Sequence, residues 1–301
     1  MVTIAGVTIT HAERELYADV GIAKGELAAY VERVAPRMLP HVQRRPLQLL
    51  RCPDGVGDGC FVQRHWTVRT TTAVRTVAID EADGDTSPYA MAGSATALVT
   101  LVQHGAVELH TWQARADRLD RPDRLVHDLD PAPGVAWSRV VEAALTVRAL
   151  LQDAGLASWC RTSGGKGVHV VAPLDRRLEW EAHAAFAKGV AEHLAKEMPT
   201  AYVAGASKAE RTGRIYIDWL RNVRGATAIA PWSPRARDGA PVAVPLPWDE
   251  LPAAGRADRW RVRDVAALLR DWGDHDPWSD LATTRQSIGR NAWAVIGQDG
   301  P

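Results

Sequence analysis

The spacing of hydrophobic residues predicts several regular elements in the first 115 residues. Within 23–42, five apolar side chains recur every three or four positions, as they do on one face of an α-helix. These are Leu27, Tyr30, Val31, Val34 and Met38. Residues 2–10 are expected to form a strand, and 46–66 and 67–80 form strands interrupted by Gly/Asp turns. Residues 95–112 have the pattern of a helix followed by a strand.

From residue 124 onward, apolar runs with strand character alternate with amphipathic helical stretches. The expected strands are 124–130, 157–173 and 213–220, and the expected helices are 137–155, 180–198 and one near 262–272. This alternation indicates an α/β fold. We expect an N-terminal lobe over residues 1–115 and a catalytic core over residues 116–301, which together form one compact unit.

Composition narrows the class of protein. The 301 residues are 46% hydrophobic and 24% charged, as in an ordinary globular protein. Basic and acidic residues number 36 each, which argues against a uniformly basic nucleic-acid binder but allows a local basic groove. We find no apolar run of about 18 residues and no signal-peptide pattern, so we expect neither a membrane span nor secretion. Cys52, Cys60 and Cys160 form an odd set without a C-x-x-C pair, which favours a reducing cytoplasm and gives no support for zinc.

Two aspartates stand one residue apart in the strand expected at 124–130. Because side chains alternate along a strand, Asp128 and Asp130 point to the same face. Two carboxylates so close together repel each other unless a cation or a proton neutralises them. Hard oxygen ligands of this kind suit Mg²⁺ or Mn²⁺. The alternative is that one aspartate caps the helix beginning near Trp137 and the other is solvated, whereas His127, on the opposite face, is expected to pack in the core.

A third aspartate lies in the strand expected at 213–220. Asp218 stands between Ile217 and Trp219 and shares the face of Tyr216. In such an apolar stretch we do not expect the aspartate to be a surface residue without a function. Three aspartates on neighbouring strands could hold two divalent ions, which bridge the phosphates of a nucleotide and activate an attacking hydroxyl.

A glycine-rich stretch, "TSGGKGVHV", occupies residues 162–170. It is not a Walker A loop, because Gly167 follows Lys166 where that motif needs Ser or Thr. Its glycines allow backbone N–H groups to approach a phosphate, and Ser163 and Lys166 add a hydroxyl and a positive charge. His169 could reach the same pocket. The alternative is a Gly-rich hairpin turn with an exposed lysine.

Taken in order, "HDLDP", "SGGKGVH" and "IDWLRN" resemble the three motifs of the archaeo-eukaryotic primase superfamily. They are most similar to those of the polymerase domain of bacterial ligase D, the non-homologous end-joining enzyme, and its stand-alone relatives. The stretches "KGELAAY", "MLPHV", "RCPDGV", "QHGAVELHTW", "RNVRGATAIAPWSPRAR" and "AVPLPWDEL" look like the same family. The resemblance implies a primase-polymerase fold, with a central, mostly antiparallel catalytic sheet flanked by helices and an N-terminal α/β lobe.

The resemblance also implies a template-directed nucleotidyltransferase. It would add nucleotides, by preference ribonucleotides, to DNA 3′ ends in end-joining or gap-filling repair. Asp128, Asp130 and Asp218 would bind two divalent cations, Mn²⁺ or Mg²⁺ and not zinc, and Asp218 would also help to position or deprotonate the primer hydroxyl. The side chains implied to bind the incoming nucleoside triphosphate are Ser163, Lys166, His169, His110, Arg211 and Arg235.

In the N-terminal lobe the resemblance implies contacts to DNA. Arg14 and Lys24 match the basic pair with which the family binds a 5′ phosphate across a gap. Phe61 matches the first of two adjacent aromatics that stack on template and base, although the second is Val62 here. The expected partners are DNA ends or gapped DNA with a 5′ phosphate, nucleoside triphosphates, and either a Ku-type end-binding protein with a separate DNA ligase or the components of another gap-filling pathway. The expected location is the bacterial cytoplasm, at the nucleoid.

Two other functions compete with this interpretation. "DLD" superficially resembles the D-x-D opening of haloacid-dehalogenase-like phosphohydrolases, but Pro131 and Ala132 follow here where that motif continues to Thr. The second is a non-catalytic DNA-end-binding module that keeps the polymerase shape. The presence of all three aspartates argues against it.

Overall fold

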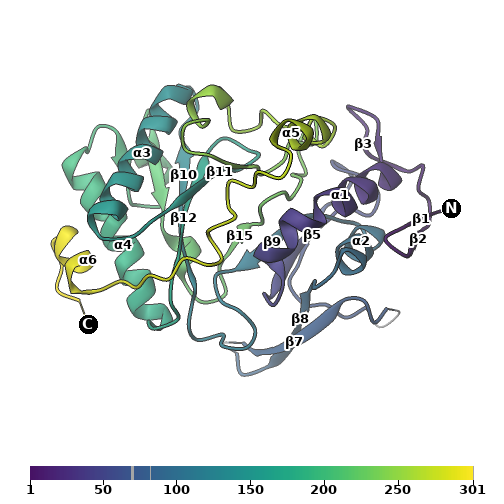
Figure 1. Cartoon of the computed structure of the whole chain (residues 1–301), viewed down its shortest axis with the longest axis horizontal. Helices are drawn as coiled ribbons and strands as arrows, with labels where there is room; N and C mark the ends of the chain where they lie inside the picture. Colours follow the sequence, from purple (N-terminus) through teal and green to yellow (C-terminus); the bar gives the residue numbers. More distant parts are fainter. Residues whose placement is uncertain (69–70, 82, 301) are drawn as a thin grey trace. The chain divides into compact units, whose positions relative to one another are not determined.

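The structure is a computed structural model that describes residues 1–68, 71–81 and 83–300, and its chain forms two compact units (Figure 1). The first unit comprises Met1–Trp112, Ile229–Ala243 and Trp260–Asp274, and the second comprises Gln113–Ala228, Val244–Arg259 and His275–Pro301. The chain therefore first leaves unit 1 close to residue 115, where the sequence places the end of the N-terminal lobe. Two later segments, Ile229–Ala243 and Trp260–Asp274, also belong to unit 1, and the sequence did not predict this.

The second unit is built on a six-stranded sheet. Its strands, in spatial order, are β13 (Tyr202–Val203), β14 (Ile215–Asp218), β10 (Arg124–Pro131), β12 (Val168–Pro173), β11 (Trp159–Thr162) and β16 (Pro245–Leu246). Only β13 and β14 run parallel, and the other neighbours are antiparallel. The expected central, mostly antiparallel sheet is therefore confirmed.

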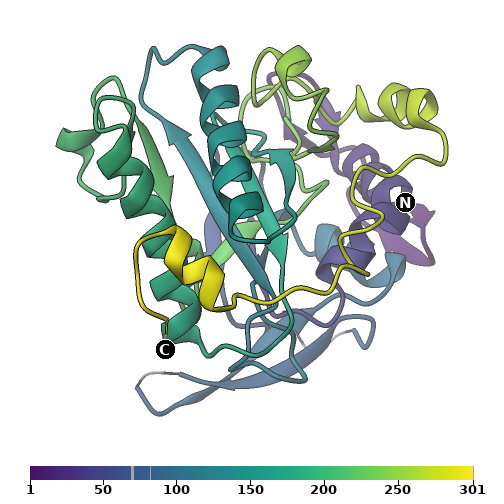
Figure 2. The same cartoon turned by 60° about the vertical axis from the view of Figure 1, so that its left-hand side comes forward.

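Helices cover one face of this sheet. Figures 1 and 2 show α3 (Trp137–Asp153) and α4 (Trp180–Glu197) on that side of β10 and β12, and α6 (Arg290–Val295) follows near the end of the chain. His127 points to this face, is fully buried, and its Nε2 lies 3.1 Å from the carbonyl oxygen of Ala187 in α4. Burial lowers the pKa of His127 to about 4, so the ring is neutral at pH 7. The expectation that His127 packs in the core is confirmed.

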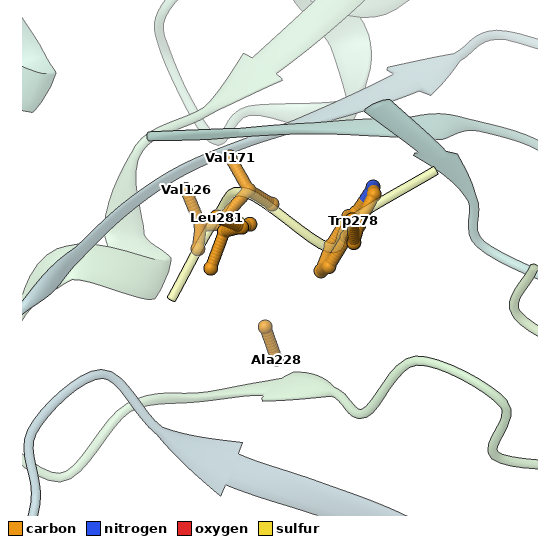
Figure 3. Packing of buried hydrophobic residues seen from close by; sticks show 5 residues of the cluster. All are labelled: Val126, Val171, Ala228, Trp278 and Leu281. Carbon is orange, nitrogen blue, oxygen red and sulfur yellow. The ribbon is translucent and has the colours of Figure 1, made fainter. Parts of the chain in front are cut away.

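The opposite face of β10 is apolar at its N-terminal end. Val126 lies directly across from Val171 in β12, and both pack with Ala228, Trp278 and Leu281. Figure 3 shows Trp278 and Leu281 projecting from one segment near the C-terminus, beside the two valines. This apolar cluster buries the first half of the strand face, which leaves the second half for the two aspartates.

The first unit contains a second sheet. Its strands run in the order β9 (Ala106–Trp112), β5 (Leu47–Arg51), β8 (Thr86–Met91) and β7 (Arg75–Asp80), with β6 (Phe61–Gln63) paired to β5. Where the chain re-enters this unit after β15 (Thr227–Ile229), the amide of Ala230 donates to the carbonyl of Leu109 (2.8 Å). Its helices are α1 (Lys24–Val42), α2 (Ala95–Gln103) and α5 (Val265–Trp272). All five apolar residues predicted to form one face of α1 are buried.

Turns divide three of the expected strands. Residues 2–10 form a hairpin of β1 (Val2–Ile4) and β2 (Val7–Ile9), because Ala5 and Gly6 adopt positive φ angles. A short pair, β3 (Glu15–Tyr17) and β4 (Ile22–Ala23), precedes α1. The stretch 157–173 is the hairpin β11–β12, and 46–66 contains β5 and β6. The strand expected from residue 67 begins at Arg75, and residues 69 and 70 of that prediction lie outside the described residues.

Further short elements follow the strands of the second unit. The expected strand 213–220 ends at Asp218, and the turn η2 (Leu220–Asn222) begins two residues later. Two more single turns are η1 (Lys208–Arg211) and η3 (Pro252–Ala254). In the part of the chain that the structure describes, no helix is both long and apolar enough to cross a membrane.

A disulfide joins Cys52 and Cys60 at an S–S distance of 2.03 Å, and Cys160 is buried and free. The bridge closes the loop between β5 and β6. The sequence did not predict it, because an odd number of cysteines favoured free thiols in a reducing compartment. Tertiary pairing of β5 with β6 is what brings the two sulfurs together.

Candidate active site

Four polar side chains form one row across the sheet of unit 2. Asp128 in β10 lies opposite Asp218 in β14 on one side and opposite His169 in β12 on the other. His169 in turn lies opposite Arg161 in β11. Directly paired residues on neighbouring strands place their side chains on the same face, about 5 Å apart. The two stretches of sequence that carry the predicted metal-binding aspartates therefore converge.

A second row lies one step further along the strands. Asp130 lies opposite Tyr216, whose hydroxyl donates to Oδ1 of Asp218 over 3.2 Å. On the other side, a β-carbon on Gly167 would lie only 1.9 Å from the carbonyl oxygen of Leu129. Only glycine allows β10 and the start of β12 to approach so closely, so this glycine of the "SGGKGVH" motif is required by packing.

Arginines face all three carboxylates. Arg221 places Nε 3.3 Å from Oδ2 of Asp128 and Nη2 2.9 Å from Oδ2 of Asp218. Arg211 places Nη1 3.2 Å from Oδ2 of Asp130, with its guanidinium 3.8 Å from the centre of the Tyr216 ring. The sequence predicted a role for Arg211 but none for Arg221, although Arg221 follows Asp218 by three residues within "IDWLRN".

The pKa values of two of the three aspartates are raised. Burial raises the pKa of Asp130, and the charge of Asp128 raises it further, against the opposing charges of Arg211 and Lys166. Burial also raises the pKa of Asp218, with Arg221 acting against the shift and Asp128 adding to it. Both shifts show that the carboxylates are partly desolvated and repel one another, so positive charge placed among them is stabilising.

His169 is held as a neutral ring in a defined tautomer. Arg161, itself buried, donates from Nη2 to Nδ1 of His169 over 2.9 Å. Since arginine only donates, Nδ1 must be the acceptor and the ring proton sits on Nε2. That nitrogen lies 3.3 Å from Oδ1 of Asp128. Burial lowers the pKa of His169 to about 4, which keeps the ring neutral at pH 7.

The glycine-rich stretch forms the turn between β11 and β12. The hydroxyl of Ser163 accepts from the amides of Gly165 (3.2 Å) and Gly167 (3.1 Å), and Gly164 has a φ of 63°. Lys166 is exposed, and its charge is felt at Asp130. The stretch is thus a hairpin turn, as the alternative interpretation stated. It also brings Lys166 near Asp130, one of the three aspartates (Asp128, Asp130 and Asp218) that we call the acidic row.

Within unit 1, Glu108 holds two other predicted nucleotide contacts. Its Oε2 lies 2.8 Å from Nε2 of His110 and 3.2 Å from Nε of Arg235, and its Oε1 accepts from the amide of Ala236 (2.8 Å). Burial would raise the pKa of Glu108, but the hydrogen bond from His110 and the charge of Arg235 outweigh it and bring the pKa to about 2. No role for Glu108 was predicted from the sequence. The feature that could have indicated a role is the position of this glutamate inside the apolar strand "AVELHTW".

The predicted DNA-contact residues also lie in unit 1. Arg14 donates from Nη1 to the carbonyl of Pro53 (2.8 Å) and pairs with Asp54 (3.2 Å). Lys24, the first residue of α1, donates to the carbonyl of Thr10 (3.2 Å). Burial and then the charge of Arg14 lower the pKa of Lys24, so the two basic side chains are near each other.

The predicted stacking residue Phe61 and its neighbour Val62 are both exposed. Phe61 is 45% exposed and Val62 is 55% exposed, which is unusual for side chains of their size. The guanidinium carbon of Arg51 lies 5.3 Å from the centre of the Phe61 ring. A flat, exposed aromatic ring beside an arginine is suited to stacking on a base.

The donor set fits hard divalent cations. Asp128, Asp130 and Asp218 supply carboxylate oxygens, the ligand type that Mg²⁺ and Mn²⁺ prefer. As the side chains lie, however, no three His, Cys, Asp or Glu residues among those described are grouped closely enough to hold a metal ion. The carboxylates are turned toward arginines instead.

The mostly antiparallel sheet of unit 2 and the carboxylates that converge across it are the features expected of a primase-polymerase. A family model described as "LigD, primase-polymerase domain" matches residues 23–278. The chain therefore belongs to the LigD primase-polymerase domain family, as the sequence motifs predicted. This membership favours the polymerase interpretation over the phosphohydrolase.

Curated relatives of this chain agree with this assignment. The multifunctional non-homologous end joining protein LigD of Pseudomonas aeruginosa is 41% identical over 285 residues, covering 94% of this chain and 34% of the relative. The LigD of Mycolicibacterium smegmatis is 32% identical over 291 residues, covering 94% and 38%. The chain thus spans about a third of the length of these relatives.

The structural comparison confirms the predicted fold class. The polymerase domain of Mycobacterium tuberculosis ligase D in complex with DNA superposes with a TM-score of 0.85 at 31% identity. The match covers 92% of this chain and 98% of that domain.

Proposed function

We propose that this chain is a template-directed primase-polymerase that adds nucleotides to the 3′ hydroxyl of DNA ends and gaps during end-joining repair. The observation that supports this proposal is the direct pairing of Asp128 with Asp218 across β10 and β14, with Asp130 on the same face. Paired carboxylates at this spacing suit nucleotidyl transfer between two divalent ions.

Asp128, Asp130 and Asp218 would hold the two cations, Mn²⁺ or Mg²⁺, which when bound neutralise phosphate charge and activate the attacking hydroxyl. Asp218 is buried, and its Oδ1 is fixed by the hydroxyl of Tyr216 and the amide of Leu220 (2.9 Å). This rigid carboxylate is suited to position the primer hydroxyl or take its proton.

The triphosphate would be bound by side chains beside the acidic row. Arg211 and Lys166 supply positive charge next to Asp130, and His169 presents a ring whose tautomer Arg161 sets. Ser163 shapes the turn through its two amide hydrogen bonds. In unit 1, His110 and Arg235 would be further contacts, oriented by Glu108. Arginine suits this role because its donors match phosphate oxygens. A preference for ribonucleotides is part of the proposal and rests on the resemblance.

Arg14 and Lys24 would bind the 5′ phosphate of gapped DNA, and Phe61 would stack on the template. The polymerase domain of the M. tuberculosis relative forms a complex with DNA, which supports DNA as the partner. A Ku-type end-binding protein and a DNA ligase activity are proposed to work with this chain, in the cytoplasm of a bacterium at the nucleoid.

Asp218→Ala tests the proposed role of the acidic row. Extension of a gapped duplex should fall by about a hundredfold or more, because one metal-binding carboxylate and the contact to the primer hydroxyl are lost. Binding to the same DNA should change little. The matched control is Asp153→Ala, which removes the same charge from an exposed position at the end of α3.

Near wild-type extension by Asp218→Ala would rule out the assignment, and loss of activity in Asp153→Ala would make the effect non-specific. The same assay, run with ribonucleotides or deoxyribonucleotides and with Mn²⁺ or Mg²⁺, measures the proposed preferences. Equal rates for the two nucleotide types would contradict the ribonucleotide preference.

A further inference from the structure

Arg221 occupies a defined position between two of the proposed metal ligands. Its guanidinium bridges Asp128 (Nε to Oδ2, 3.3 Å) and Asp218 (Nη2 to Oδ2, 2.9 Å), and its side chain is 39% exposed. It projects from η2, the single turn that follows β14. The contact joins two strands, so it is more than a pair between neighbours in sequence.

The turn that carries Arg221 is fixed to the sheet by its neighbour Asn222. The side chain of Asn222 is fully buried, accepts from the amide of Val126 (2.8 Å) and donates to the carbonyl of the same residue (2.7 Å). It also donates to the carbonyl of Trp219 (2.8 Å). These bonds hold η2 against β10, so the position of the Arg221 backbone is set by the fold.

The bridge has a clear electrostatic cause. Asp128 and Asp218 are direct cross-strand partners, and like charges in that relation destabilise a sheet. A guanidinium can donate to two carboxylates at once through its planar fork, which a lysine cannot do with the same geometry. Arg221 thus supplies between these carboxylates the positive charge that a divalent ion would supply there.

We propose that Arg221 is a built-in counter-cation of the metal site, which holds Asp128 and Asp218 together in the metal-free protein and is displaced when a divalent ion binds. Metal affinity is then set partly by the free energy of breaking this bridge. The inference rests on the proposed function, since it takes the two aspartates as metal ligands.

Direct binding of Mn²⁺ tests this inference without nucleotide, DNA or turnover. Free Mn²⁺ is followed by electron paramagnetic resonance as it is titrated into wild-type protein and Arg221→Gln. We expect the dissociation constant to fall about tenfold in Arg221→Gln, because a competing charge 2.9–3.3 Å from the ligand oxygens is removed, and partial exposure screens that charge. The matched control, Arg139→Gln, removes an arginine of α3 that pairs with Glu142 outside the site, and should bind Mn²⁺ as the wild type does.

Thermal unfolding gives a second, independent measurement. In a chelator, Arg221→Gln should melt below the wild type, because Asp128 and Asp218 are left facing each other, and Mn²⁺ should raise its melting temperature more than that of the wild type. Arg221→Lys keeps the charge but loses the fork, so its Mn²⁺ affinity should lie between the other two. This variant provides the test if Arg221→Gln does not fold without metal.

Asp128→Asn separates the inference from the function on which it rests. If Asp128→Asn loses Mn²⁺ binding while neither Arg221 variant binds Mn²⁺ more tightly than the wild type, the counter-cation role is overturned and the metal site stands. If Asp128→Asn binds Mn²⁺ as well as the wild type, both the metal site and the role of Arg221 are overturned.

Discussion

Gly167 shows how a single atom can set the geometry of this site. A β-carbon there would lie 1.9 Å from the carbonyl oxygen of Leu129, the residue between Asp128 and Asp130. Such a distance cannot be tolerated, and the obstructing atom belongs to the backbone of β10. Any shift that relieves the clash therefore moves the strand that carries both aspartates.

Gly167→Ala should lower the free energy of unfolding by about 3 kcal/mol and reduce primer extension, because overpacking forces the backbone of β10 to move. Urea unfolding and the gapped-duplex assay measure the two effects. Gly289→Ala is the matched control in the same unit, since a β-carbon there meets nothing within 4 Å. Wild-type stability in Gly167→Ala would show that the two strands can separate freely.

At the residue scale, the sequence identified side chains with chemistry but not the groups that hold them. Asp128, Asp130 and Asp218 were predicted as site residues because carboxylates in apolar strands are costly unless they have a function. Arg161 contacts His169, and Glu108 contacts His110. The first of these contacts depends on the register between β11 and β12, which residue types alone do not specify.

At the scale of elements, one loop connects the disulfide with the predicted 5′-phosphate site. The loop closed by Cys52 and Cys60 contains Pro53 and Asp54, both of which bind the guanidinium of Arg14. Within it, the amide of Val56 donates to the carbonyl of Leu16 (2.7 Å), next to β3. The disulfide therefore restrains the support of Arg14 and the start of β6, where Phe61 stands.

Reduction of this disulfide should lower the free energy of unfolding by about 2–3 kcal/mol, since the bridge closes a loop with a sequence separation of 8. Urea unfolding with and without a dithiol reductant measures the difference. The control is the double variant Cys52→Ser and Cys60→Ser, which should be insensitive to reductant. Equal stability of the wild type in both conditions would show that the bridge contributes nothing.

At the scale of the whole molecule, buried histidines couple stability to pH. Burial brings the pKa of His127 and of His183 to about 4 in the folded chain, against roughly 6.5 when unfolded. Below pH 6.5 the unfolded chain therefore binds protons that the folded chain does not. The stabilisation is complete above that pH and is lost as pH falls toward 4.

The free energy of unfolding should accordingly fall between pH 7 and pH 5, by up to about 1.4 kcal/mol per pH unit for each of these histidines. Urea unfolding at both pH values measures the slope, and His127→Leu should reduce it because one titrating group is removed. Met38→Leu, a buried substitution that removes no titrating group, is the control and should keep the wild-type slope. An unchanged slope in His127→Leu would contradict the assignment.

By itself the sequence predicted the main helices, the strand that carries two aspartates, and the family of this protein. Periodicity placed α1, α3 and α4, alternation along β10 put Asp128 and Asp130 on one face, and three ordered motifs identified the family. These features are local, since each depends on residues a few positions apart.

Only the tertiary structure decided which distant residues meet. Asp218 pairs with Asp128, Arg221 lies between them, Cys52 reaches Cys60, and two late segments return to the first unit. Strand order and register are set by how whole faces pack, and one residue of slip would send every side chain of β14 to the opposite face. Strand order and register depend on the free energy of the complete sheet, so they cannot be predicted from any short stretch of sequence.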